Sequence, residues 1–250
     1  MSEANAQPED PETAPPSVFQ APAVVPVLIG LLVAIHVILQ LAGTDWQIWA
    51  LYAFAFIPAR FGGGEAMPFI PGSQYWSLLS HAFLHADWTH LMFNSLWLLI
   101  FGTVAARYMG SLRFLVLAAA SAVAGALATL ALHWGESAIM IGASGAVSGL
   151  MAASVPIMYG RGMRWGTVLA GSPEAARPLS PLELLRNRNA VIFTVVWLVI
   201  TLFSGATGWT GNSFLAEGGI AWEAHLGGFL AGLVAFYLLA PQVRAQASRM

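Results

Sequence analysis

Long apolar stretches recur along the chain and are separated by shorter polar segments. A bilayer core about 30 Å thick is crossed by roughly 20 apolar residues in an α-helix. Stretches of about that length predict six membrane-spanning helices, at residues 24–42, 89–107, 113–133, 143–160, 190–206 and 222–240. The pattern therefore predicts an all-α membrane protein with a six-helix bundle.

The polar segments divide the chain into three parts. Residues 1–22 are rich in proline, alanine and acidic side chains and predict a disordered acidic N-terminal tail. Residues 23–241 form the predicted six-helix domain, and residues 242–250 a short cytoplasmic C-terminal tail. The first connection, about 43–88, is long and aromatic, and its tryptophans predict a segment at the membrane interface.

Composition supports lipid as the solvent of this chain. Hydrophobic residues make up 58% of it and charged residues 9%, against about 25% charged in soluble domains. The net charge of −2 gives no reason to expect a nucleic-acid partner. The absence of cysteine excludes disulfides, thiolate metal sites and a cysteine nucleophile.

The arginines predict the orientation in the membrane. All ten basic residues are arginine. With six spans, only Arg60 lies on the side opposite to both termini, and the other nine share the side of the termini. Basic residues concentrate on the cytoplasmic side, so both termini are expected there. A bacterial inner membrane is the expected location.

A serine and a histidine at the starting ends of two spans suggest nucleophilic catalysis. Spans two, four and six all begin on the outer side, so Ser144 and His225 are expected at one depth. Serine needs a neighbouring base, and histidine can take and return a proton near neutral pH. The free N–H groups of a first helical turn favour a developing oxyanion.

Structural explanations compete with this one. Ser144 lies among Gly142, Gly145 and Gly149, which are also typical of close helix contacts in membranes. His225 could equally be a buried ring bonded to a carbonyl group. Ser148 is a rival nucleophile one turn later, but it lacks the terminal amides.

A cluster of polar side chains opens the second span. His90 and Asn94 share a helix face, and the Asn94 amide suits an oxyanion hole, with His85 as a second donor. His81, His85 and His90 offer a competing zinc site, but no HExxH motif accompanies them, so no metal is expected. Asp87 is interpreted as a loop or cap residue.

The remaining ionisable groups look structural. His36 lies alone in the first span and is expected to pack or form a hydrogen bond. His133 and Glu136 lie in the short third loop, where they are expected to be solvated. Glu223 is close to His225 in sequence but does not share its helix face. A Ser–His dyad, without a third acidic member, is the resulting prediction.

Three motifs in this order resemble the rhomboid proteases. They are HAFLHADWTHLMFN at 81–94, GASG at 142–145 and AHLGGFLAG at 224–232, and FIPARF at 56–61 resembles first-loop sequence of bacterial members. The resemblance covers about residues 24–240. It implies a nucleophile at Ser144, a base at His225, and an oxyanion hole of Asn94, His85 and the Ser144 amide. His90, Gly142, Gly145, Gly228 and Gly232 would play supporting roles.

The resemblance implies an intramembrane serine endopeptidase. It would cleave transmembrane segments of single-span or other membrane proteins near the outer face of the membrane, through an acyl-enzyme intermediate. No cofactor is expected, and a monomer would be sufficient for activity. A catalytically inactive client-binding relative and a small transporter are the alternatives. The sequence departs from many members at Ser148, where an aromatic residue is common, and at Trp76-Ser77, where Trp-Arg is common.

Overall fold

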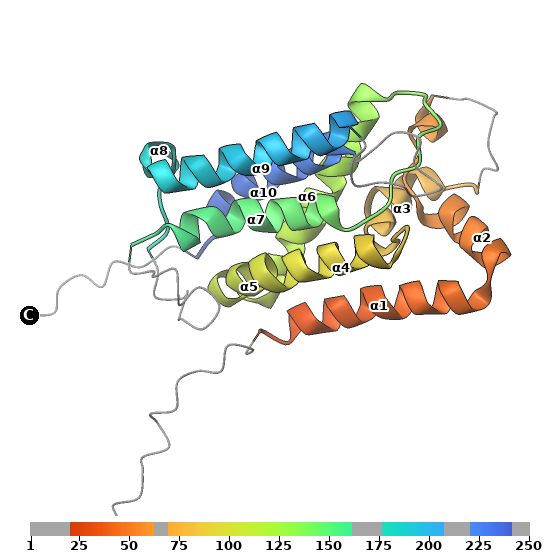
Figure 1. The fold of residues 1–250 in the computed structure, drawn as a ribbon, viewed down its shortest axis with the longest axis horizontal. Helices are drawn as coiled ribbons and strands as arrows, with labels where there is room; N and C mark the ends of the chain where they lie inside the picture. The colour runs from red at the N-terminus through yellow and green to blue at the C-terminus, as the bar shows by residue number, and fades with distance from the viewer. Residues whose placement is uncertain (1–20, 63–69, 162–176, 208–220, 242–250) are drawn as a thin grey trace, which may run out of the picture.

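A computed structural model describes residues 21–62, 70–161, 177–207 and 221–241. Residues 1–20 of the predicted N-terminal tail, the whole predicted C-terminal tail, the Gly63-Gly64 break and Arg164 lie outside these ranges. Within them the regular elements are helices, accompanied by two isolated β-bridges. The long helices lie roughly side by side and alternate in direction along the chain (Figure 1).

The structure has helices at all six predicted positions, with bounds within two residues of the prediction. They are α1 (Val24–Ala42), α4 (Trp88–Trp97) with its continuation to Met109, α6 (Ser111–Leu132), α7 (Ser144–Met158), α9 (Arg188–Thr207) and α10 (Trp222–Leu239). The continuation of α4 is a π-helical turn, Leu98–Gly102, followed by α5 (Thr103–Met109). Four of these are long and apolar enough to cross a membrane: α1, the α4–α5 unit, α6 and α10. The other two, α7 and Arg188–Phe203 of α9, are shorter apolar helices.

The long first connection contains helices of its own. It comprises α2 (Thr44–Phe54), a 3-10 turn at Pro58–Phe61, α3 (Ser73–Ser80) and a second 3-10 turn at His81–Phe83. Trp46 and Trp49 on α2 and Tyr75 on α3 are exposed. These exposed rings are what an interfacial segment requires.

Side chains within this connection satisfy the free carbonyl groups at the end of α2. Arg60 donates to the carbonyl oxygens of Tyr52, at 2.5 Å, and Ala55, at 2.7 Å. Trp76 Nε1 donates to Ala53, and the Ser80 hydroxyl to Phe54. Because the last carbonyls of a helix have no partner within it, these bonds hold the end of α2 against the Pro58–Phe61 turn and against α3.

Backbone contacts between glycines hold α6, α7 and α10 together. A Cβ on Gly228 of α10 would collide with the Gly145 carbonyl of α7, and a Cβ on Gly232 would collide with Gly149. Between α6 and α10, a Cβ on Gly125 of α6 would lie 2.7 Å from the Ala224 carbonyl oxygen. Only glycine allows this separation, so we call these contacts the glycine seam.

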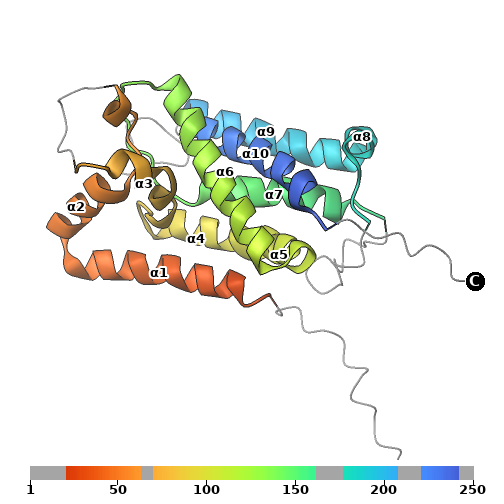
Figure 2. The ribbon, with the colours of Figure 1, turned by 180° about the vertical axis from the view of Figure 1, so that it is seen from behind.

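The glycine seam fixes the register of two helices. Gly228 faces Gly145, and four residues later Gly232 faces Gly149. Therefore α7 and α10 run in the same direction without slipping relative to each other, and both begin at the same end of the bundle (Figure 2). That end also carries the start of α4.

We expect Gly232→Ala to destabilise the fold by about 1–3 kcal/mol, the usual cost of an added methyl in a packed interior. The new methyl group would force α10 away from the backbone of Gly149. The measurement is the thermal unfolding temperature of the purified protein in detergent. Gly30→Ala in α1 is the matched control, because its Cβ would meet no atom of the described chain within 4 Å. Equal unfolding temperatures for the two variants would contradict the seam.

Candidate active site

Ser144 and His225 both lie beside the first contact of the glycine seam. Ser144 is the first residue of α7 and precedes Gly145, and His225 is the fourth residue of α10, three before Gly228. Residues three apart share a helix face, so His225 is on the side of α10 that packs against α7. The backbone of Ala224 reaches Gly145, whose Cβ would lie 3.5 Å from the Ala224 carbonyl oxygen. Both residues are half-buried.

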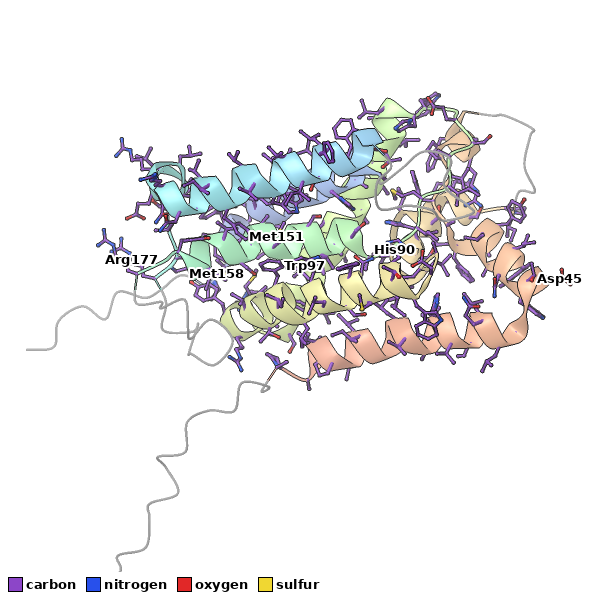
Figure 3. All side chains as sticks on the ribbon, in the orientation of Figure 1. Asp45, His90, Trp97, Met151, Met158 and Arg177 are labelled. Carbon is purple, nitrogen blue, oxygen red and sulfur yellow. The ribbon has the colours of Figure 1, made fainter. Side chains whose placement is uncertain are left out.

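The segment that leads into Ser144 packs against α4. Gly142 has φ = +116°, and its N–H donates to the His81 carbonyl at 3.0 Å. A Cβ on Gly142 would lie 2.6 Å from His90 Nε2 and 3.6 Å from Asn94 Nδ2. Two nitrogen atoms from one face of α4 thus point at the backbone just before Ser144. Figure 3 shows His90 at the start of α4, far from Met158 at the end of α7.

Asn94 offers an uncommitted donor at this place. The residue is buried, and its Nδ2 has no hydrogen-bond partner among the described residues. A buried amide without a partner costs free energy, so such a group is typical of a site completed by a bound molecule or water. Asp87 is the N-cap of α4 and accepts from the His90 N–H at 2.8 Å, which confirms its interpretation as a cap.

The ring of His85 lies between His90 and a small cavity shared with α1 and α2. His85 precedes α4, and its ring packs edge-on against the ring of His90, with centroids 5.1 Å apart. It lines a cavity of about 50 Å³ together with His36, Gln47 and Ile141. The side-chain atoms nearest to a Cβ at Gly142 belong to His90 and Asn94, and the role of His85 as a second donor stays a prediction.

The other polar residues of this region have structural contacts. The Nδ1 atom of His81 lies 2.8 Å from the Ser77 carbonyl oxygen. His36 packs edge-on against Trp88 with centroids 4.7 Å apart, as its interpretation as a packing residue predicted. Ser148 is buried in α7. No group of three His, Asp or Glu side chains suited to a metal ion occurs in the parts of the chain that the structure describes.

One acid–histidine cluster was missed by the sequence analysis. His133 and Glu136 were expected to be solvated, and Glu223 was given no partner. In the structure the His133 ring lies between the two carboxylates, with Nδ1 2.8 Å from Glu136 and Nε2 3.2 Å from Glu223. The Glu223 side chain is 7% exposed. His133 and Glu223 are far apart in sequence, and no local pattern could have paired them.

Comparison with known proteins decides the family. A family model described as Rhomboid domain matches residues 72–242, more than half of the chain. The chain belongs to the rhomboid family. The matched range of this rhomboid domain contains α3, α4, α7 and α10, and with them every residue of the candidate site.

Individual bacterial relatives agree with the rhomboid assignment. The chain is 25% identical over 211 residues to the rhomboid protease GlpG of Serratia proteamaculans, which covers 83% of this chain and 59% of that protein. It is 25% identical over 204 residues to GlpG of Yersinia pestis, covering 82% and 58%. The Bacillus subtilis protein YdcA is 31% identical over 113 residues, or 45% and 56%. The aligned part of the chain thus spans less than two thirds of the length of each of these relatives.

Proposed function

We propose that this chain is an intramembrane serine endopeptidase with a Ser144–His225 dyad. The observation that carries the proposal is the contact of Gly145 with Gly228, which brings the start of α7 against the first turns of α10. His90 and Asn94 face the backbone beside the same serine. The GlpG relatives are named rhomboid proteases, which supports the same reaction class for this chain.

In the proposed reaction His225 accepts the Ser144 hydroxyl proton while Oγ attacks the carbonyl carbon of a substrate peptide bond. The tetrahedral intermediate collapses, His225 gives the proton to the leaving amine, and an acyl-enzyme remains. Water, deprotonated by His225, then attacks the ester and releases the second product and the free serine. The substrates would be transmembrane segments of single-span or other membrane proteins, and one chain would be sufficient.

We assign the oxyanion hole to His90 Nε2, Asn94 Nδ2 and the Ser144 backbone N–H. The amide of Ser144 is free of helix bonding because it lies at the first position of α7. His85, packed against the His90 ring, would then orient that ring rather than donate to the substrate. This arrangement supplies preorganised donors where negative charge develops.

We further propose six spans, made by α1, the α4–α5 unit, α6, α7, α9 and α10, within a domain of residues 23–241. The short α7 needs little contact with lipid, since thirteen of its fifteen residues are buried. Arg177 lies at the end of the bundle opposite His90 (Figure 3). The positive-inside rule then puts both termini in the cytoplasm and the site at the outer face of a bacterial inner membrane.

Ser144→Ala should abolish cleavage and leave the fold intact, because a methyl group cannot attack and the substitution removes one oxygen atom. The measurement is cleavage of a panel of single-span reporters by the purified protein, beside labelling by a fluorophosphonate probe. The wild type should label at residue 144, and Ser148→Ala should still label there. Reporter binding without labelling or cleavage by the wild type would instead favour a catalytically inactive client-binding relative.

Removing one oxyanion donor should lower kcat by about 10²–10³, with a small change in KM. We expect this loss for His90→Ala and for Asn94→Ala, because both nitrogens face Gly142. His85→Ala should cost less, since its ring contacts His90 instead. A larger loss for His85→Ala than for His90→Ala would reverse our assignment of the two histidines.

Gly142→Ala should reduce cleavage by about 10²-fold or more, because its methyl would displace His90 and shift the approach to Ser144. The backbone of Gly142, at φ = +116°, also disfavours a side chain. Gly110→Ala is the matched control, since Gly110 has φ = +79° but a Cβ there meets no described atom within 4 Å. Equal activity of the two variants would contradict a specific role for the contact between Gly142 and His90.

A further inference from the structure

The cluster of Glu136, His133 and Glu223 joins the ends of two helices at the outer side of the candidate site. His133 is the C-cap residue of α6, and Glu223 is the second residue of α10. The helices pack antiparallel, with Gly125 of α6 against Ala224 of α10. The ion pair between His133 and Glu223 therefore closes the outer end of this helix pair, two residues before His225.

The ring of His133 lies between two carboxylates. A neutral imidazole has one N–H donor and one acceptor nitrogen. The two His133 nitrogens face a carboxylate each, at 2.8 and 3.2 Å. A protonated His133 ring would be attracted by both carboxylates, because opposite charges attract.

The charge of Glu223, and that of a protonated His133, would match the helix ends on which they lie. The C-terminus of a helix favours a cation, and the first turn favours an anion. His133 lies at the C-terminus of α6, and Glu223 lies in the first turn of α10. None of the described side chains caps the N-terminus of α10. Glu223 is a polar side chain that ties this turn to the end of α6.

The third member connects the cluster to the first loop. The Glu136 carbonyl accepts from the Ala59 N–H at 2.8 Å, and Met140 pairs with Phe56 through two backbone bonds. The exposed ion pair of Glu136 with His133 contributes little by itself, since its carboxylate is 59% exposed. The buried partner, Glu223, is the one whose loss should matter.

We propose that Glu223, held by His133, is a positioning residue that fixes the first turn of α10 and so places His225 against Ser144. The inference rests on the proposed protease function and deepens it. Neither residue would touch the substrate. Misplacing a catalytic group by about 1 Å can lower the rate by about 10²-fold. A poorly fixed first turn of α10 would therefore lower kcat rather than weaken substrate binding.

The test compares Glu223→Gln and His133→Gln with the wild type in the full-length chain. Three readouts are taken: the rate of fluorophosphonate labelling at Ser144, kcat and KM for a single-span reporter, and the thermal unfolding temperature. We expect labelling rate and kcat to fall by about tenfold or more, with KM changed by less than about twofold. His133→Arg, which places a cation beside Glu223, should recover most of the activity.

Two carboxylates serve as matched controls. Glu136→Gln removes the exposed half of the cluster, and Glu183→Gln removes a carboxylate beside Arg161, outside the cluster. Both should label and cleave at rates close to the wild type. The double variant His133→Gln/Glu223→Gln should be no slower than the slower single variant, because the two residues act through one contact.

The outcomes separate this inference from the proposed function. A wild-type protein that is neither labelled nor able to cleave the reporter would contradict both the protease function and the positioning role of Glu223. A wild type that labels and cleaves, with Glu223→Gln at the same rates, defeats the positioning role alone. Additive losses in the double variant would also overturn it. If Glu223→Gln folds poorly, rates are compared for the fraction that elutes as the native species, and His133→Gln and His133→Arg carry the same test.

Discussion

Backbone contact between α7 and α10 is the constraint on which the rest of this structure depends. Lipid tails are as apolar as leucine side chains, so helices in a membrane associate through close packing and not through the hydrophobic effect. Gly145, Gly149, Gly228 and Gly232 let the two backbones touch, and Gly125 adds α6 to the contact. Such close contact prevents the two helices from sliding along each other. It can therefore keep a serine on one helix at a fixed position relative to a histidine on the other.

The loops hold the segment before Ser144 in place beside the glycine seam. Gly142 is bonded to the His81 carbonyl, and Met140 pairs with Phe56, so the approach to Ser144 is fixed by the first loop. The first loop is in turn held by Arg60 and Trp76 on the end of α2. Polar side chains at membrane depth are costly unless they have a use. His90, Asn94 and His225 lie at one end of the bundle, where α4 and α10 begin.

Much of the fold could be predicted because hydropathy reports directly on helices in lipid, and the helix bounds agree within two residues. The inner structure of the first loop could not, since bonds such as that of Arg60 to Tyr52 leave no periodic signal. The choice between His85 and His90 as the second donor depends on which ring faces the segment before Ser144, and the sequence pattern does not give this; in the structure His90 is next to Gly142. The pairing of His133 with Glu223 depends on how α6 and α10 pack, which only the tertiary structure reveals.

The central claim is that the glycine seam brings residues 144 and 225 together, and the absence of native cysteine makes it directly measurable. Cysteines introduced in the pair Ser144→Cys/His225→Cys can be treated with a short bifunctional thiol reagent in native membranes. The account predicts rapid intramolecular cross-linking of this pair and none for the control pair Ser144→Cys/Trp46→Cys, which joins α7 to α2. Failure of the 144/225 pair to cross-link in protein that is otherwise folded would contradict the account.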